Sequence, residues 1–232
     1  MGSPLIIGLS GKKQSGKDTV CSAIFMNLHG YMMDSFVSVY SFADMLKQNI
    51  CKDVLGLTEE QINGTDEQKN SNTIYRWENF PDTIRYVNAI ETEQIRKGGT
   101  IDQFQTLPVL RTGFMTSREI MQVVGTDIFR DYFDDDIWVN AVFRRIKEGD
   151  RKVVIISDVR FPGEVDRIIS EGGYIIRLLR DVGIKDCHSS EGALDNYDFV
   201  SWGNRVSLID NQNMSIEEQN NVAINYVKSL LP

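Results

Sequence analysis

The residues with the clearest capacity for chemistry lie near the start of the chain. Gly11 and Gly16 enclose four residues and Lys17 follows them, which gives the spacing G-x-x-x-x-G-K. The apolar run Leu5–Leu9 precedes this pattern and an amphipathic stretch follows it, so we predict the order strand, loop, helix. Backbone N–H groups in such a loop, the positive end of the helix dipole and the lysine all favour an anion. The stretch therefore indicates a site for nucleotide phosphates rather than a surface turn with a solvated lysine.

The residue after this lysine departs from the usual pattern, because Asp18 stands where serine or threonine is common. A carboxylate beside a polyphosphate is repelled unless a cation lies between them. We therefore predict that Asp18 ligates Mg²⁺, directly or through water, and that Thr19 offers its hydroxyl to a phosphate oxygen. The residues predicted to bind the nucleotide cofactor are Gly11, Lys12, Lys13, Ser15, Gly16, Lys17, Asp18 and Thr19.

The composition narrows the class of protein. The chain has 232 residues, of which 41% are hydrophobic and 25% charged, as in a globular protein built on one domain. The net charge of −8 argues against a broad nucleic-acid surface, and the three cysteines lack C-x-x-C spacing. Because no apolar run is long enough to cross a membrane, we expect a soluble, cytoplasmic protein.

Strands and helices alternate along most of the chain. The clearest strand is Val153–Asp158, which is apolar and β-branched without alternation, as buried parallel strands are. Further strands are predicted at Leu5–Leu9, Phe36–Ala43, Tyr174–Leu179 and Phe199–Trp202, with helical patterns between them. We therefore predict an α/β fold, in which helices cover both faces of a parallel sheet of about five strands.

One region interrupts this alternation. Polar residues dominate from 63 to 116, and Gly98, Gly99 and Pro108 break up any long element. We predict a single domain over 1–232, with residues 63–116 as an inserted, mainly helical subdomain for substrate binding or dimerisation. A helix should follow at Thr116, which forms a capping-box pattern with Glu119. Residues 181–197 read as a short polar connector that could act as a lid.

Charged residues follow two predicted strands at their carboxyl ends, where ligands collect in parallel sheets. Asp158 ends one strand, Arg160 follows it, and Arg180 ends the next strand. An acid at this position suits Mg²⁺ or its water shell, and the arginines suit a phosphoryl group in transfer. The alternatives are a helix cap for Asp158 and a salt bridge for each arginine, for example to Glu164.

Further candidates could bind a substrate. Arg118 lies in the first turn of a predicted helix, where a cation opposes the helix dipole unless an anion is present. Trp138 could shape a pocket for a base or sugar, although an aromatic residue at helical spacing is more often part of the core. The predicted substrate-binding residues are Lys47, Arg111, Arg118, Gly125, Thr126, Asp127 and Trp138, with solvated surface charge as the alternative for the lysine and Arg111.

Several of these segments occur together in one known family. They are Ser10–Thr19, Phe42-Ala43 with Lys47, Arg118 through Met121-Gln122 to Gly125–Asp127, Trp138-Val139, Ser157–Arg160, Glu164, Gly172-Gly173 with Arg177 and Arg180, and His188 with Glu191. Together they resemble the bacteriophage deoxynucleoside monophosphate kinases, within the P-loop group of nucleoside monophosphate kinases and dephospho-CoA kinases. The resemblance runs from about Leu5 to the final helix and is weakest from Asn63 to Thr112.

This resemblance implies a P-loop NTPase-type fold and transfer of the γ-phosphoryl group of ATP, with Mg²⁺, to a deoxynucleoside 5′-monophosphate. Catalysis then falls to Lys17 at the β- and γ-phosphates, Asp18 and Asp158 at Mg²⁺, and Arg160 and Arg180 at the transferring group. The partner is a small nucleotide, and in a phage the compartment is the host cytoplasm.

The resemblance also implies roles outside the catalytic centre. Arg118 and the segment Gly125–Asp127 would hold the substrate nucleotide. Apart from the resemblance, the insertion is a candidate homodimer contact, and the oligomeric state stays open. The segment Ser201–Asn204 looks similar to a family segment that ends in asparagine, so Asn204 would face the adenine. Three alternatives stay open: a kinase for a modified base in phage DNA, a dephospho-CoA kinase, and a regulator that binds ATP without catalysis.

Overall fold

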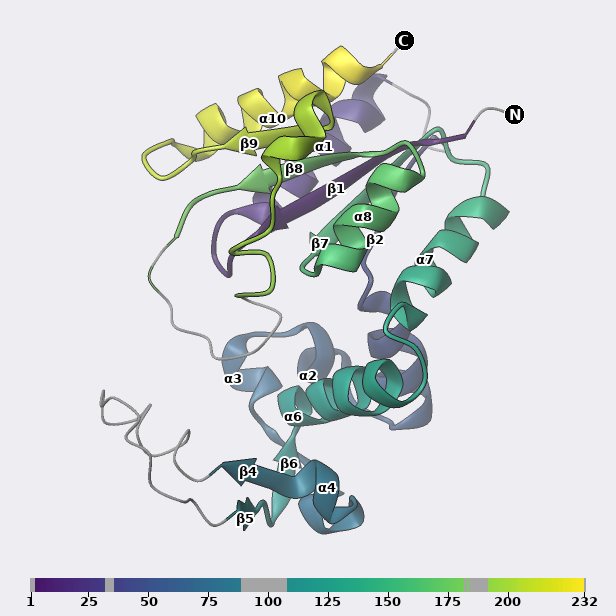
Figure 1. Ribbon diagram of the computed structural model, residues 1–232, viewed down its shortest axis with the longest axis vertical. Coiled ribbons are helices and arrows are strands. Elements are labelled where there is room, and N and C mark those ends of the chain that lie inside the picture. The colour runs from purple at the N-terminus through teal and green to yellow at the C-terminus, as the bar shows by residue number, and fades with distance from the viewer. Residues whose placement is uncertain (1–2, 32–35, 89–107, 182, 184–191, 232) are drawn as a thin grey trace. The chain divides into compact units, whose positions relative to one another are not determined.

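The structure, a computed structural model, describes residues 3–31, 36–88, 108–181, 183 and 192–231 (Figure 1). Its elements form two compact units. The sheet unit consists of Met1–Met45 and Asp136–Pro232, and the inserted unit consists of Leu46–Asp135. The inserted unit contains the polar stretch 63–116 and extends beyond it on both sides.

The sheet unit is built on five parallel strands in the order β2-β7-β1-β8-β9. They are β1 (Leu5–Gly11), β2 (Val37–Tyr40), β7 (Val153–Val159), β8 (Tyr174–Leu178) and β9 (Val206–Ile209). This arrangement confirms the predicted α/β fold. The chain passes from β1 to β2 on one side and later to β8 and β9 on the other, so its connections diverge at the carboxyl end of β1. Ligands bind at such points in open parallel sheets.

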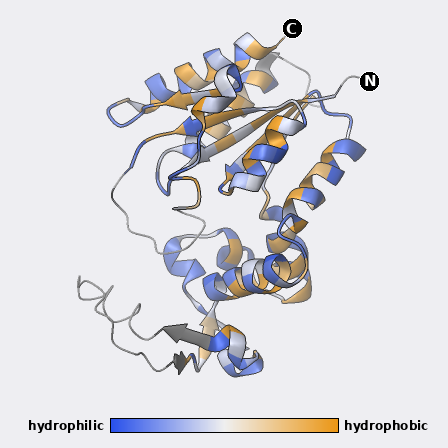
Figure 2. Ribbon diagram, in the orientation of Figure 1, coloured by the Kyte–Doolittle hydropathy of each residue, from blue (hydrophilic) through white to orange (hydrophobic). Residues whose placement is uncertain are grey.

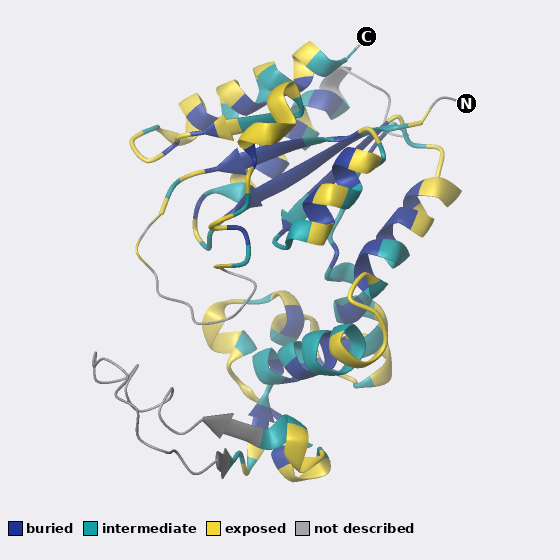
Figure 3. Ribbon diagram, in the orientation of Figure 1, coloured by how far each residue is buried: buried dark blue, intermediate teal, exposed yellow. Residues whose placement is uncertain are grey.

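The central strands are buried because apolar residues follow one another in them without alternation. Ile155 and Ile156 of β7 have no exposed surface, and Figure 3 shows the central strands in dark blue. Side chains on successive residues of β1 reach opposite faces. At Gly8 a Cβ atom would come within 2.7 Å of the Cδ1 atoms of Ile168 and Ile175, so only glycine permits this close packing.

Helices cover both faces of the sheet. On one face, α1 (Lys17–Tyr31) packs against α10 (Ile216–Leu230). On the other face, α8 (Pro162–Ser170) contacts β1 and β8, and α7 (Ile137–Glu148) pairs with α8 where the guanidinium of Arg167 lies 4.8 Å from the ring centre of Phe143. These helices carry both hydrophilic and hydrophobic residues, whereas the central strands are mostly hydrophobic (Figure 2).

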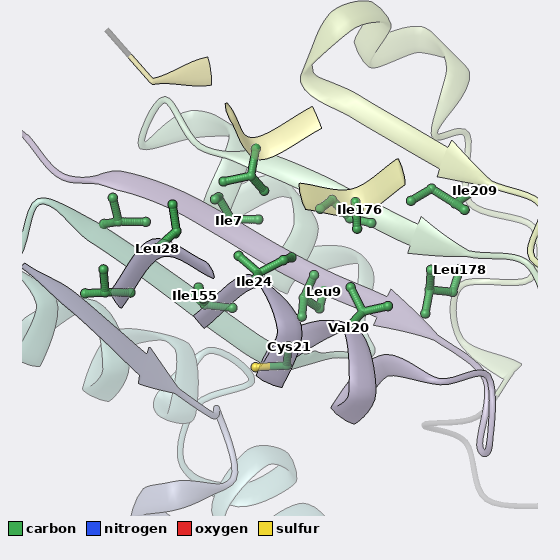
Figure 4. Close-up of a cluster of buried hydrophobic side chains, with 14 residues drawn as sticks. Ile7, Leu9, Val20, Cys21, Ile24, Leu28, Ile155, Ile176, Leu178 and Ile209 are labelled. Atoms are coloured by element: carbon green, nitrogen blue, oxygen red, sulfur yellow. The ribbon is translucent and has the colours of Figure 1, made fainter. Parts of the chain in front are cut away.

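The core on the α1 face joins segments from both ends of the chain (Figure 4). Apolar side chains from α1, the five strands and α10 form one cluster, which buries more surface than any single helix could. Its members are Ile7, Leu9, Val20, Cys21, Ile24, Leu28, Val37, Val153, Ile155, Ile176, Leu178, Ile209, Ala223 and Val227. This cluster fixes α1, and therefore the loop that precedes it, against the sheet.

The prediction of a strand at Phe199–Trp202 is wrong. The chain forms a short 3-10 turn at Val200–Arg205, and the fifth strand begins only at Val206. The carboxylate of Asp198 accepts hydrogen bonds from two backbone N–H groups of this turn, at 3.1 and 3.2 Å. Gly203 then adopts a φ of 54°, a left-handed conformation that glycine tolerates, and turns the chain into the strand.

Within the predicted insertion 63–116, the described residues divide between short helices, as predicted, and two antiparallel strand pairs, which the sequence patterns did not reveal. Strand β3 (Asn72–Arg76) pairs with β6 (Phe114–Thr116), and β4 (Tyr86–Asn88) pairs with β5 (Pro108–Leu110). The α-helices of the inserted unit are α2 (Glu59–Asn63), α3 (Asp66–Lys69), α4 (Asp82–Arg85) and α6 (Ser117–Gln122), and Trp77–Asn79 forms a 3-10 turn. The capping box at the start of α6 is confirmed.

Two segments of this part of the chain are π-helical, Met45–Val54 and Val123–Arg130. They meet where Gly125 faces Leu46, and a Cβ atom on Gly125 would come within 2.5 Å of that leucine. Because π-helical turns are rare and frequently occur at functional sites, these segments mark the inserted unit for attention. Among the helices of the described residues, none combines the length and the apolar character needed to cross a bilayer.

Candidate active site

The loop predicted to bind phosphate follows β1 directly. Steric constraints explain why two of its positions are glycine. Gly16 has a φ of +98°, which side chains rarely adopt. A Cβ atom on Gly11 would lie 2.5 Å from the hydroxyl of Ser15. This hydroxyl is buried, and among the described residues it has no hydrogen-bond partner, which is unusual for a buried polar atom. The loop therefore offers a polar interior at the divergence point of the sheet.

The lysine of the motif lies across the start of the loop. The Nζ atom of Lys17 donates hydrogen bonds to the carbonyl oxygens of Gly11 and Lys12, the second at 2.8 Å. Lys17 also begins α1, so its charge and the positive end of the helix dipole occupy the same place. This geometry suits an anion at the mouth of the loop.

Asp158 binds the turn after β2, a contact that the sequence did not indicate. One oxygen of its carboxylate accepts hydrogen bonds from the hydroxyl of Ser41 (2.6 Å) and the N–H of Ala43 (3.2 Å). The other accepts from the N–H of Phe42 (2.7 Å). Three donors thus tie the turn after β2 to the end of β7. A carboxylate has about four lone-pair sites, so Asp158 retains limited capacity for a further ligand.

The two acids predicted to serve Mg²⁺ lie close enough to share a neighbour. Cys21 of α1 is 7% exposed, and burial raises the pKa of its thiol to about 11. The negative charges of Asp18 and Asp158 contribute to this rise after burial, which is the larger cause. Both carboxylates are therefore within electrostatic reach of one thiol at the carboxyl end of the sheet.

The two arginines expected at the transferring group have different surroundings. Arg160 is half-buried, and its backbone N–H donates to the carboxylate of Glu164 at 2.6 Å. The same carboxylate caps the start of α8. The guanidinium of Arg180 donates to the carbonyl oxygens of Asn211 (2.7 Å) and Met214 (2.8 Å). Arg180 thus clamps the turn after β9, and any role at a phosphoryl group stays a prediction.

Lys12 connects the loop to the connector after β8. Its ammonium pairs with Asp181 at 2.8 Å and with Asp195 at 3.5 Å, and the bond to Asp181 raises the pKa of Lys12. Asp195 also faces the buried Arg177, which donates to the hydroxyl of Ser10 at 2.9 Å. A pocket of about 280 Å³ adjoins these charges. His188 and Glu191, which the resemblance pointed to, lie outside the described residues.

Two residues are placed away from the positions expected of them. Asn204 precedes β9, and its neighbour Arg205 donates to the carbonyl of Gly172 before β8, so both lie at the amino end of the sheet. Because the loop lies at the carboxyl end, the assignment of Asn204 to adenine does not fit the structure. Trp138 is only 7% exposed in α7, which matches the core alternative.

The other predicted substrate-binding residues lie in the inserted unit. Arg118 pairs with Asp66 at 2.7 Å and donates to the side chain of Asn70 at 3.0 Å. The guanidinium of Arg111 lies 4.7 Å from the ring centre of Trp77. Lys47 and the residues Gly125, Thr126 and Asp127 belong to the π-helical segments.

The sequence analysis missed the residues that hold the loop in place. The side chain of Asn211 is fully buried and donates to the carbonyl of Ser15 at 2.8 Å. It also donates to Gln219 of α10, likewise at 2.8 Å. The only signal in the sequence is a polar residue directly after a strand, which turns often contain for other reasons.

Fold and site together define a class. A glycine-rich loop with its lysine, set at the carboxyl end of the central strand of a parallel sheet and followed by a helix, is the architecture of P-loop nucleotide-binding proteins. The chain belongs to the deoxynucleotide monophosphate kinase family, whose model matches residues 5–213.

Relatives support this assignment. A protein of Acanthamoeba polyphaga mimivirus, assigned by name to the deoxynucleotide monophosphate kinases, is 30% identical over 89% of this chain and 97% of its own length. The deoxynucleoside-5′-monophosphate kinase of Escherichia phage T5 is 26% identical over 69% of this chain and 70% of its own. A gluconokinase structure from Sinorhizobium meliloti 1021 covers 99% of this chain and 95% of its own, with 11% identity and a TM-score of 0.41. That score is too low to support an argument.

Proposed function

We propose that this protein transfers the γ-phosphoryl group of ATP to a deoxynucleoside 5′-monophosphate, giving the diphosphate and ADP. The observation that carries the proposal is the loop at the carboxyl end of β1, where Lys17 lies across a glycine-bounded turn with the start of α1 behind it. Membership of the deoxynucleotide monophosphate kinase family supplies the acceptor class.

The reaction requires no covalent intermediate with the protein. The attacking atom is a phosphate oxygen that is already ionised at neutral pH, so positioning and charge neutralisation replace a strong general base. The oxygen bonds to the γ-phosphorus of ATP as the bond to the β-phosphate bridging oxygen breaks, and ADP leaves. Lys17 binds the β- and γ-phosphates in this proposal, and Arg160 neutralises charge on the group in transfer. Arg180 supports the turn beside the loop and adds positive charge at the same edge.

Mg²⁺ fits the side chains present at this edge. The ion prefers oxygen ligands and is commonly held by one or two carboxylates together with substrate phosphates, the rest of its shell being water. Asp18 supplies an exposed carboxylate, whereas Asp158 is largely occupied by Ser41, Phe42 and Ala43. We therefore assign the ion to Asp18 and its water shell to Asp158. Bound Mg²⁺ would supply charge neutralisation on the phosphates.

The acceptor nucleotide is proposed to bind through the inserted unit. Arg118 and Arg111 offer planar guanidinium groups for its phosphate, and Lys47 offers a further positive charge. Thr126 and Asp127 offer a hydroxyl and a carboxylate for hydrogen bonds to the sugar or base. The pairing of Arg118 with Asp66 supports this role, because it shows that this arginine already binds an anionic oxygen at this position.

The direct test is turnover with a defined set of acceptors. The purified protein is mixed with ATP, Mg²⁺ and each of the deoxynucleoside monophosphates, with base-modified forms included, and ADP and the new diphosphate are measured. We expect a diphosphate from at least one acceptor and none when Mg²⁺ is chelated. If none of the acceptors yields a diphosphate while ATP still binds, the proposed reaction is wrong and the regulator alternative is favoured.

Homodimer formation through the inserted unit is a separate proposal. Ile74 and Phe114 of the β3–β6 pair are 81% and 53% exposed, which supports a contact there. Sedimentation of the wild-type chain and of Ile74→Glu checks it, since a dimer contact at this pair predicts that the charge lowers the mass to that of one chain. A single-chain mass for the wild type would contradict it.

A further inference from the structure

Asn211 occupies the junction of three segments that are far apart in the sequence. It follows β9 and has no exposed surface. Its Nδ2 atom donates to the carbonyl of Ser15 and to Oε1 of Gln219, each at 2.8 Å. Its Oδ1 atom accepts from the N–H of Arg180 at 2.9 Å. The phosphate-binding loop, the end of β8 and α10 therefore meet at one side chain.

The hydrogen bonds fix the orientation of this amide. The carbonyl of Ser15 can only accept, and the N–H of Arg180 can only donate, so rotating the amide by half a turn would oppose like groups at both contacts. Only a side chain with a donor and an acceptor on one carbon satisfies both positions. Aspartate offers no donor, and leucine of similar size offers neither.

The contact with Ser15 controls the loop through the geometry of the peptide bond. In a trans peptide the C=O and the following N–H point in opposite directions. Because Asn211 holds the Ser15 carbonyl on its own side, the N–H of Gly16 is directed to the opposite side of that peptide. Gln219 completes the arrangement, because its amide lies 2.9 Å from where a Cβ atom of Gly16 would be.

We propose that Asn211 is a positioning residue that sets the phosphate-binding conformation of the loop, with Gln219 as its support. The inference rests on the proposed function, since it assigns to the loop the phosphates of ATP. Asn211 acts through Ser15 and Gly16 and does not touch the reacting atoms. Its effect therefore falls on the phosphate donor and leaves the acceptor unaffected.

The variant Asn211→Asp tests this with little change in shape. The new carboxylate still accepts from the N–H of Arg180, and the amide of Gln219 can rotate to donate to it. Only the Ser15 carbonyl loses its donor and faces an anion. Because this buried carbonyl is left without its donor, we expect the KM for ATP and the Kd for tripolyphosphate to rise at least about tenfold. The KM for the deoxynucleoside monophosphate should change less than about twofold.

The matched control is Gln212→Glu, one residue further along. Gln212 is exposed, and its Oε1 accepts from the N–H of Asp181, which a glutamate can still do. Its Nε2 donates to the carbonyl of Asp181 at 3.4 Å, a long exposed bond that the glutamate loses. This variant therefore adds the same charge without removing a contact to Ser15. We expect its Kd for tripolyphosphate to stay within about threefold of wild type. An equal loss in both variants would overturn the proposal by assigning the effect to charge alone.

Other outcomes are equally decisive. Equal changes in both KM values, or an unchanged tripolyphosphate Kd in a folded Asn211→Asp protein, would overturn the positioning role. If Asn211→Asp does not fold, Gln219→Leu serves instead, because it removes the support for Asn211. This variant should raise the KM for ATP selectively. A change in both KM values would again contradict the positioning role. Tripolyphosphate binding is measured calorimetrically without turnover, so inactivity of the wild type would count against the proposed reaction and not against this residue.

Discussion

The two units of this protein secure the side chains proposed for the site in different ways. In the sheet unit, the buried Asn211 binds a loop that lies almost two hundred residues earlier in the sequence, and the buried Gln219 binds Asn211. In the inserted unit, Arg118 is 30% exposed and its partner Asp66 is 59% exposed. Hydrogen bonds shielded from water are stronger than exposed ion pairs, whose typical contribution is about 0–1 kcal/mol.

This difference in burial distinguishes the phosphate loop, whose conformation is fixed, from the arginines of the inserted unit, which can change partners. The loop for phosphates is held by a buried network before any ligand arrives, which lowers the ordering cost of binding. The arginines of the inserted unit hold partners that they can exchange at little cost. We infer that the phosphate-donor site is preorganised and that the acceptor site forms as its arginines change partners.

The largest effect is expected from the sheet unit, in Lys17→Ala. Removing a positive charge aimed at the β- and γ-phosphates should lower kcat/KM by at least about 100-fold. Its Nζ donates to the backbone carbonyls of Gly11 and Lys12 in a part-buried setting, and neither carbonyl belongs to the apolar core, so the thermal midpoint should change little. Steady-state kinetics and thermal unfolding measure the two effects, with Lys52→Ala as an exposed lysine control. Turnover similar to wild type in Lys17→Ala would refute the role of this lysine.

The second-largest effect is expected in Asp158→Asn. This variant tests whether one side chain of the sheet unit contributes both to the stability of the fold and to activity. The amide nitrogen must face one of the donors at Ser41, Phe42 or Ala43, so one buried contact becomes repulsive. We expect a loss of about 2 kcal/mol in unfolding free energy together with a fall of more than about tenfold in kcat/KM. Denaturant unfolding and kinetics check this, and Asp150→Asn at an exposed position serves as control. Full activity in a destabilised protein would leave Asp158 a purely structural role.

In the inserted unit, Arg118→Ala should separate binding from stability. We expect the KM for the deoxynucleoside monophosphate to rise about tenfold, with the KM for ATP unchanged. The unfolding free energy should fall by less than about 1 kcal/mol, since the lost ion pair is exposed. The companion Asp66→Ala frees the arginine, so it should lower the acceptor KM. A higher acceptor KM in Asp66→Ala would show that the ion pair positions Arg118 instead of competing with the substrate.

The smallest effect at neutral pH concerns one buried thiol in each unit. Burial raises the pKa of both Cys21 and Cys51 from about 9 to about 11, the carboxylates of Asp18 and Asp158 adding to the effect at Cys21 and Lys47 opposing it at Cys51. Between pH 9 and 11 the unfolded thiols ionise while the folded ones stay neutral. Each thiol's contribution to the free energy of unfolding is therefore complete below pH 9. It declines by about 1.4 kcal/mol per pH unit between pH 9 and 11.

Unfolding of the alanine variants at a series of pH values tests this directly. Cys21→Ala and Cys51→Ala should each flatten the decline above pH 9. Asp18→Asn should lower the pKa of the Cys21 thiol and leave that of Cys51 in place, as measured by the pH dependence of alkylation. An unchanged Cys21 pKa in Asp18→Asn would show that this carboxylate does not reach the thiol.

Much of the fold could be predicted because the relevant signals are local. The β-branched run of β7 and the capping box of α6 depend on neighbouring residues, and both were found where the patterns indicated. The fifth strand was misplaced because Phe199–Trp202 is as apolar as a strand. The carboxylate of Asp198 and the turn at Gly203 decide against it there. The antiparallel pair of β3 and β6 was missed because its strands lie far apart in a polar stretch.

The sequence by itself determined the glycine-bounded loop, its lysine and the parallel sheet beneath it, because these depend on spacing within a few residues. Only the tertiary structure decided which asparagine serves the loop. Asn204 and Asn211 are equally polar in the sequence, yet one lies at the amino end of the sheet and the other at the carboxyl end. A contact between residues 15 and 211 depends on how five strands are ordered, and no local pattern encodes that order.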